Sequence, residues 1–173
     1  MEYEEELLDL VNENDEVIGT VLRAEYYAAP IQHEGYLRAV EIFIVDDQGR
    51  LWIPRRTMDK KIAPGGLDYS CGGHVSSGES YIESGLREIE EELNLHLHEN
   101  DLHLVKKFHP VPGMQWFREI YKYQTNEVPA YNPNDFSEYE WLTPAELIAK
   151  LEAGEPAKSS LLYTVKEIVD TLK

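Results

Sequence analysis

The fold of this chain is best predicted from residues 73–95, which read GHVSSGESYIESGLREIEEELNL. Apolar side chains recur in this stretch at intervals of four, three and four residues, at Ile82, Leu86, Ile89 and Leu93. This is the spacing of an amphipathic helix, in which one stripe of side chains packs against the core. Each residue turns a helix by about 100°, so the glutamates of the same stretch lie in a separate sector. We therefore predict a helix with one packed face and one open, acidic face.

The acidic face is formed by Glu88, Glu91 and Glu92, at positions i, i+3 and i+4 of the predicted helix. Ser84 and Gly85 lie one turn earlier in the same sector and are too small to cover it. Carboxylates on adjacent turns repel one another. Hard divalent cations such as Mg²⁺ and Mn²⁺ take oxygen ligands at this density. The pattern therefore indicates a cation site, and its spacing alone leaves a solvated acidic face as the alternative.

The same stretch resembles the Nudix box, G-x5-E-x7-R-E-U-x-E-E-x-G-U, where U is an apolar residue. Eight of the nine fixed positions are matched, by Gly73, Glu79, Arg87, Glu88, Ile89, Glu91, Glu92 and Leu95. Asn94 stands where the family has its last glycine. That residue ends the helix in the left-handed region, where asparagine is the next best choice after glycine. A match of this length is far more specific than a lone short motif.

The Nudix resemblance implies roles for the residues of the box. The implied catalytic residues and metal ligands are Glu88, Glu91 and Glu92, with the carbonyl of Gly73 as a further ligand. The implied cofactor is Mg²⁺ or Mn²⁺, which would neutralise diphosphate oxygens while a carboxylate, here taken as Glu88, orients or deprotonates the attacking water. Glu79 and Arg87 would form a structural pair, for which Glu83 is the local competitor at i, i+4.

Basic residues precede the box. Arg55 and Arg56 end a predicted strand, at a position where many Nudix proteins carry a basic residue that faces the substrate, and Lys60 and Lys61 follow. These four residues are our candidates for substrate binding. Because side chains alternate along a strand, only one of the two arginines is expected to face the site. The alternative is that all four are surface cations that balance acidic neighbours.

Length and composition restrict the class of protein. The 173 residues suit one domain, residues 1–173, with a sizeable core. A formal net charge of −17 argues against nucleic-acid partners and anionic membranes. No apolar run is long enough to span a membrane, and residues 1–6, MEYEEE, lack the basic start of a secretory signal. The single cysteine, Cys71, agrees with a reducing compartment, so we predict a cytoplasmic protein.

Around the box, the remaining elements indicate an α/β fold. Residues 1–36 form a predicted N-terminal extension with a β-hairpin, 7–11 and 16–22, around a polar turn, followed by a short helix or turn at 23–29. Further strands are predicted at 39–45, 50–54, 102–108, 116–124 and 138–142, a loop at 57–69, and helices from 143 to Gly154 and over 161–172. Strands on both sides of a central helix predict an α/β/α sandwich over a mixed sheet, which the resemblance also implies.

A second resemblance competes with the first. The N-terminal hairpin and residues 68–74, DYSCGGH, are similar to type I isopentenyl diphosphate isomerase, a Nudix-fold enzyme that moves protons with a cysteine and a glutamate. His74 matches a metal histidine of that family, and Glu119 could stand for its acidic residue. However, the isomerase cysteine falls one residue past Cys71, and the metal histidine expected just before Ala39 is missing. The complete set of box glutamates also favours a hydrolase.

We therefore predict a metal-dependent Nudix hydrolase, of the isomerase-like subgroup, that cleaves a nucleoside diphosphate or related small-molecule diphosphate by water attack at phosphorus. The alternatives are isopentenyl diphosphate isomerase and a non-catalytic nucleotide-binding module on the Nudix fold. Modules of the latter kind usually have degraded box carboxylates, whereas all of them are intact here.

Overall fold

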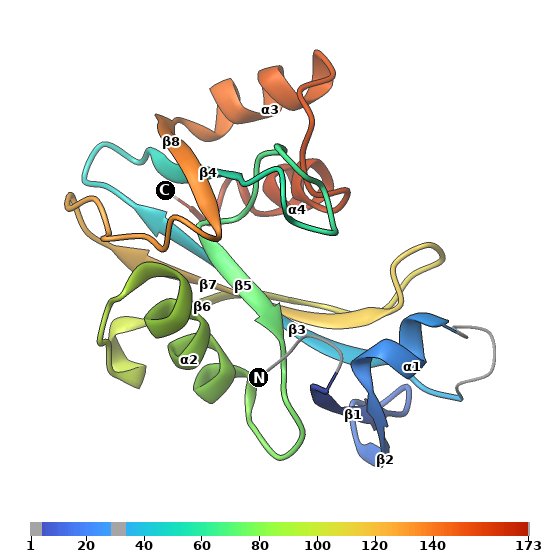
Figure 1. Cartoon of the computed structure of the whole chain (residues 1–173). Helices are drawn as coiled ribbons and strands as arrows, with labels where there is room; N and C mark the ends of the chain where they lie inside the picture. Colours follow the sequence, from blue (N-terminus) through green and yellow to red (C-terminus); the bar gives the residue numbers. More distant parts are fainter. Residues whose placement is uncertain (1–4, 29–33, 173) are drawn as a thin grey trace.

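The computed structural model describes residues 5–28 and 34–172, and it places a mixed sheet between two layers of helices (Figure 1). The elements of the sandwich are β3 (Leu37–Val45), β4 (Leu51–Arg56), β5 (Cys71–His74), α2 (Tyr81–Leu93), β6 (His103–Phe108), β7 (Trp116–Gln124), β8 (Phe136–Leu142), α3 (Pro144–Glu152) and α4 (Leu161–Ile168). The six strands run in the order β6-β7-β3-β4-β8, with β5 paired to β3 off this path. Helix α2 covers one face, and α3 and α4 cover the other (Figure 1). The predicted α/β sandwich is confirmed.

Strand β3 is the centre of the sheet. It pairs in parallel with β7 over nine residues and antiparallel with β5 over four. Its Val, Ile and Phe side chains are buried on both faces, as expected of a strand between two helical layers. Val40 and Ile42 belong to the core beneath α2, whereas Phe43 belongs to the core beneath α3 and α4. The alternation of side chains along β3 thus joins the two cores.

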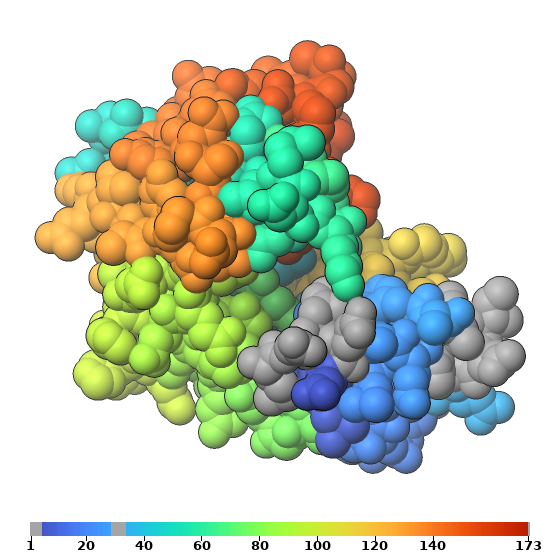
Figure 2. Space-filling view, in the orientation of Figure 1, coloured from blue at the N-terminus to red at the C-terminus, as the bar shows by residue number. Residues whose placement is uncertain are grey.

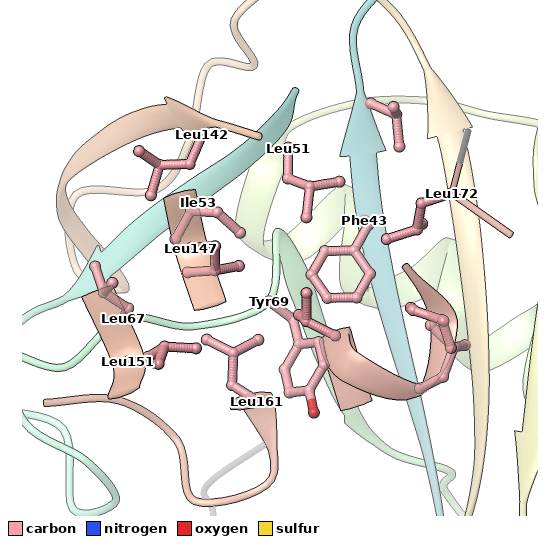
Figure 3. Close-up of a cluster of buried hydrophobic side chains, with 14 of the residues drawn as sticks. Phe43, Leu51, Ile53, Leu67, Tyr69, Leu142, Leu147, Leu151, Leu161 and Leu172 are labelled. Atoms are coloured by element: carbon pink, nitrogen blue, oxygen red, sulfur yellow. The ribbon is translucent and has the colours of Figure 1, made fainter. Parts of the chain in front are cut away.

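The core beneath α3 and α4 is shown in Figure 3. Phe43 and Leu51 of the sheet meet Leu147 of α3 and Leu161 of α4, and all four side chains are fully buried. Tyr69 is buried with them, and its hydroxyl donates to Thr164 Oγ1 of α4 at 2.8 Å. Because an unpaired buried hydroxyl is costly, this bond fixes where the chain before β5 crosses α4.

Helix α2 is capped at both ends, and the cap at Asn94 is the one predicted. Ser80 and Glu83 form a reciprocal capping box at its start, and Asn94 ends it in the left-handed region with φ 53°. The predicted faces are partly wrong, however. The buried residues of the helix include Ser84, Gly85 and Glu88, which had been expected to lie open. The reason is that Gly85 has no side chain, so a Cβ there would lie 3.3 Å from Val40 and the helix packs close to β3.

The predicted N-terminal hairpin is confirmed as β1 (Leu7–Val11) and β2 (Val17–Leu22), a separate two-stranded sheet followed by α1 (Arg23–Ala28). The predicted extension 1–36 also includes residues 1–4 and 29–33, which lie outside the described residues. Leu8 and Val21 are buried against Leu37, where the extension joins the sheet. Asp15, in the hairpin turn, accepts hydrogen bonds from Arg38 Nε and Lys107 Nζ, each at 2.5 Å. Two partly buried ion pairs therefore clamp the turn to the domain.

Several predicted boundaries shift because pairing, not local pattern, sets them. Strand β3 begins at Leu37, which is fully buried and pairs with Trp116. Strand β5 had been assigned to no element, and it forms because β3 supplies its hydrogen-bonding partner. Helix α3 ends before Gly154, near the predicted stop, whereas α4 ends at Ile168, short of the predicted 172. Within the described ranges, no helix is long and apolar enough to cross a membrane.

Candidate functional site

A cavity of about 430 Å³ lies where β5, α2, the 57–66 loop and the start of α4 meet. Figure 2 shows the turquoise 57–66 loop overhanging a hollow that the green box segment borders from below. Gly73, Glu88 and Glu92 form part of its wall, and α1 adds Arg23 and Tyr27. The cavity is therefore built from segments that are far apart in the chain, from Arg23 to Ser160.

Glu88 is buried at the inner side of α2. Its exposed fraction is 9%, and its carboxylate accepts from Arg87 Nη1 at 2.9 Å. The carboxylate rests against the backbone of Gly73, because a Cβ on that residue would lie only 2.2 Å from Glu88 Oε1. Burial raises the pKa of Glu88, and the positive charge of Arg87 offsets this rise only in part. Glycine at position 73 is thus what lets the carboxylate reach the cavity.

Glu92, one turn further along α2, borders the same cavity. Its Oε2 accepts from the backbone N–H of Gly72 at 3.2 Å. Burial first, and then the charge of Glu88, hold the pKa of Glu92 well above its ordinary value. Two carboxylates on one wall therefore stand close enough to repel each other, an arrangement that is costly without a counter-charge.

Glu91 is placed differently from the other two predicted ligands. Its side chain is 60% exposed, does not border the cavity, and lies 3.4 Å from Arg87 Nη1. Within residues 5–28 and 34–172, no group of three or more His, Cys, Asp or Glu side chains stands ready to hold a metal ion. The structure thus brings Glu88 and Glu92 together and leaves Glu91 at the outer edge, beside Arg87.

Arg87 connects the box loop to its helix. Its Nε lies 3.2 Å from Glu79 Oε1, and its Nη2 donates to the carbonyl of His74 at 3.3 Å. Glu79 also accepts from Ser84, and Glu83 is occupied at the helix cap rather than by Arg87. Glu79 and Arg87 therefore hold the loop before α2 against the helix, as the resemblance implies.

The candidate basic residues divide between the cavity and the surface. Arg56, Lys60 and Lys61 border the cavity. Arg56 is 8% exposed and donates to Asp68 Oδ2 at 2.5 Å, and Lys60 pairs with Asp135. Strand alternation turns Arg55 away.

Arg55 instead pairs with Glu138 and Glu155, each at 2.7 Å. It also donates to the carbonyl of Gly65 at 2.9 Å. It therefore holds the 57–66 loop in place from outside the cavity.

Several cavity residues were missed by sequence reasoning. Lys158, Ser159 and Ser160 border it just before α4, and Lys158 lies 3.1 Å from Asp68 Oδ1. Arg118 and Glu41 border it from β7 and β3, paired at 3.0 Å. Arg118 could have been predicted from the sequence, because a charged residue at an inward position of a predicted strand needs a buried partner. For Lys158 no local signal existed, because it meets the box only through the fold.

Comparison with known proteins decides the family. The family model of the NUDIX domain matches residues 35–164. The chain belongs to the Nudix family. It is 44% identical over 162 residues to an uncharacterized Nudix hydrolase from Nostoc sp., with 93% of this chain and 94% of that protein covered. A Nudix hydrolase from Deinococcus radiodurans is 42% identical, with 94% and 93% covered. The protein is therefore a Nudix hydrolase.

Solved structures agree with this assignment. The crystal structure of DR0079 from Deinococcus radiodurans has a TM-score of 0.84 and 41% sequence identity, and covers 94% of this chain and 99% of that chain. The MutT Nudix hydrolase from Burkholderia pseudomallei, at 21% identity with a TM-score of 0.60 over 78% of this chain and 99% of that one, shares the fold. The Nudix fold thus extends beyond the box to almost the whole chain.

The isomerase alternative gains no support within the Nudix family. Cys71 is buried and does not border the cavity, and burial raises the pKa of its thiol well above the ordinary value. Glu119 points elsewhere, accepting from Tyr121 at 2.6 Å and lying 3.4 Å from Lys107. Of the isomerase-type set only His74 borders the cavity, and burial followed by the charge of Arg23 lowers the pKa of His74 to about 3. The structure does not gather these residues into one site.

Nudix hydrolases generally use a divalent metal ion, and the residues present fit one. Glu88 and Glu92 offer two carboxylates on one cavity wall, whose mutual repulsion a dication would relieve. Gly73 leaves room at its backbone, since a side chain there would collide with Glu88. Glu91 has an exposed carboxylate on the adjacent turn. The donors are oxygen atoms, which suit Mg²⁺ and Mn²⁺ rather than softer metals.

Proposed function

We propose that this Nudix hydrolase cleaves a nucleoside diphosphate or a related small-molecule diphosphate, and that it requires Mg²⁺ or Mn²⁺. The observation that carries the proposal is one cavity bordered both by two carboxylates of α2, Glu88 and Glu92, and by cations from other segments, Arg56, Lys60, Lys61 and Lys158. A diphosphate needs both kinds of side chain. Carboxylates hold the metal ions that bind its oxygens, and basic side chains pair with the negative charge that the metal ions do not neutralise.

The carboxylate side supplies the metal ligands and the base. Glu88, Glu91, Glu92 and the carbonyl of Gly73 are the proposed ligands, and Glu91 would have to leave Arg87 to take part. A bound divalent ion would neutralise the diphosphate oxygens and polarise their bonds to phosphorus. Glu88 is our choice for the carboxylate that accepts the proton of the attacking water. Attack at phosphorus then breaks its bond to the bridging oxygen and releases phosphate or a monophosphate.

The cation side compensates for the charge of the whole protein. At a formal net charge of −17, the chain repels anions at long range, so a diphosphate depends on local basic groups. Arg56 and Lys158 are both held by Asp68, which fixes them at the cavity wall. Arg55 lies outside the cavity, and we propose that it positions the loop that carries Lys60 and Lys61.

The N-terminal extension, the single cysteine and the net charge support our proposals on domain organisation, location and partners. Because Arg23 and Tyr27 border the same cavity as the box, we treat residues 1–173 as one domain. The single cysteine, Cys71, suits a cytoplasmic location, where thiols stay reduced. The acidic charge disfavours nucleic acid as a partner, in keeping with a small-molecule substrate.

The test is phosphate release from a panel of nucleoside diphosphates, sugar nucleotides and isopentenyl diphosphate, with and without Mg²⁺. We expect hydrolysis of a diphosphate that stops when the metal is chelated and falls by orders of magnitude in Glu88→Gln and Glu92→Gln. Glu90→Gln is the matched control, because Glu90 is exposed on the other side of the same helix. Full activity in both cavity variants would remove the proposed site, and double-bond migration in place of hydrolysis would indicate the isomerase reaction.

A further inference from the structure

Two side chains of β7 border the cavity and carry buried hydrogen-bond donors for which the described part of the chain supplies no acceptor. Arg118 is 2% exposed, yet among residues 5–28 and 34–172 its Nε and Nη2 have no hydrogen-bond partner, and Trp116 Nε1 has none there either. The two residues are separated by one position, so their side chains lie on the same face of the strand. Buried donors are nearly always paired in folded proteins, and an exception beside a cavity indicates a missing acceptor.

Arg118 is held rigidly by its other nitrogen. Its Nη1 donates to Thr164 Oγ1 at 2.8 Å, to Glu41 Oε2 at 3.0 Å and to Tyr69 Oη at 3.3 Å. Its guanidinium also lies over the ring of Phe108, 4.7 Å from the centroid. These contacts fix the plane of the guanidinium and leave its other edge, formed by the buried Nε and Nη2, without an acceptor among the described residues. That edge presents two parallel N–H donors, the geometry that binds two oxygens of a phosphate at once.

The surroundings of Arg118 favour a small anionic group. Arg118, Lys158 and Arg56 border the cavity against two buried carboxylates, Asp68 and Glu41, which leaves an excess of positive charge on this side. Tyr69, Thr164 and Phe108 contact the guanidinium of Arg118 and are buried, so the cavity does not continue past it. A closed end of the cavity with unpaired donors suits a terminal group of the substrate. It does not suit an internal group, because the rest of the substrate would have no room beyond it.

We propose that Arg118, with Trp116 beside it, binds the terminal phosphate of the substrate. This rests on the proposed function and narrows it, because it makes the substrate a diphosphate with a free terminal phosphate. A diphosphate capped at both ends, such as a sugar nucleotide, cannot place a terminal phosphate at this closed end. The β7 residues then select the substrate, while the box residues on α2 carry the reaction.

The test compares Arg118→Lys with wild type on two substrates, a nucleoside diphosphate and the corresponding nucleoside diphosphate sugar. Lysine keeps the charge beside Glu41 but loses the paired donors, so we expect KM for the nucleoside diphosphate to rise by about 10- to 100-fold. KM for the capped substrate should change little, and the preference between the two should narrow. Arg50→Lys is the matched control, because Arg50 pairs with Asp46 away from the cavity.

A binding experiment separates this inference from the proposed function. Titration calorimetry with inorganic pyrophosphate, without metal and without turnover, should show binding to wild type that Arg118→Lys weakens by a similar factor. If wild type hydrolyses no diphosphate, the proposed function fails, and weakened pyrophosphate binding by the variant still supports the anion site. If wild type is active and Arg118→Lys matches it in both KM and pyrophosphate affinity, the inference is overturned. Glu41→Gln combined with Arg118→Met, which leaves no unpaired charge, repeats the test should the lysine variant fold poorly.

Discussion

Replacing Gly73 with alanine should displace the carboxylate of Glu88 and slow hydrolysis while the chain stays folded. The added Cβ would lie 2.2 Å from Glu88 Oε1 and 2.6 Å from its Cδ, whereas ordinary contacts begin at 3.4 Å. The oxygen must therefore retreat by 1.2 Å to reach an ordinary contact distance, the difference between the first and last of these distances. Such a retreat also disturbs its 2.9 Å bond to Arg87 Nη1.

The size of the effect follows from that displacement. A catalytic group misplaced by about 1 Å costs roughly 100-fold in rate, so kcat should fall by about that factor. Stability should change little, because Gly73 is not one of the glycines with positive φ and alanine can adopt its backbone. Alanine also restricts the unfolded chain, which stabilises by about 0.4–1 kcal/mol and offsets part of the local strain.

The assay is phosphate release at saturating Mg²⁺, with thermal denaturation measured in parallel. Gly19→Ala is the control, because a Cβ at Gly19 meets no atom of the described residues within 4 Å. We expect wild-type activity from the control and a low kcat with a near-native Tm from Gly73→Ala. An unchanged kcat in Gly73→Ala would refute the reasoning that the position of the Glu88 carboxylate limits the reaction.

Three further substitutions test the clamp, a helix cap and the thiol. Burial opposes ionisation of Asp15, but hydrogen bonds from Lys107 and Arg38 outweigh it and lower its pKa. Its stabilisation is therefore complete above the ordinary carboxyl pKa and lost as pH falls through the lowered one, so denaturant titrations should show less acid dependence in Asp15→Asn than in wild type. Thr143→Ala removes the cap of α3 and should cost about 1 kcal/mol in the same titration, whereas an unchanged value would contradict the cap. Cys71→Ala should leave hydrolysis unaltered, because the thiol lies outside the cavity, and lost activity in a folded variant would restore a chemical role for it.

Local patterns predicted the elements whose partners lie nearby in the sequence. The period of α2 and its end at Asn94 depend on residues within a few positions, so both could be predicted directly. Strand β5 could not, because its sequence, CGGH, has no alternation and becomes a strand only beside β3. The buried sector of α2 was misjudged for a similar reason: Gly85 was taken as a sign of openness, and it permits close packing on Val40.

In the cavity, too, the residues from one local segment could be predicted, whereas those brought together by the fold could not. Its carboxylate side comes from one helix and was predicted from spacing together with the resemblance to the box, whereas its opposite side collects residues from β3, β7 and the start of α4. Lys158 follows Glu92 by 66 positions, and no local pattern links the two. Strand alternation predicted that only one of Arg55 and Arg56 would face the site, but choosing between them required the register of β4 with β8.

The contacts of Arg87 show which glutamates of the box already have a positively charged partner. The sequence predicts that its clustered glutamates need a counter-charge, and Arg87 supplies part of it by contacting Glu79, Glu88 and Glu91. Glu92 is held differently, by the backbone N–H of Gly72, and it borders the cavity beside Glu88. The shortage of positive charge therefore lies inside the cavity and not on the outer face of α2. We infer that a divalent ion is needed at Glu92 first, so Glu92→Gln should weaken Mn²⁺ binding more than Glu91→Gln, and calorimetry showing the reverse order would contradict this placement.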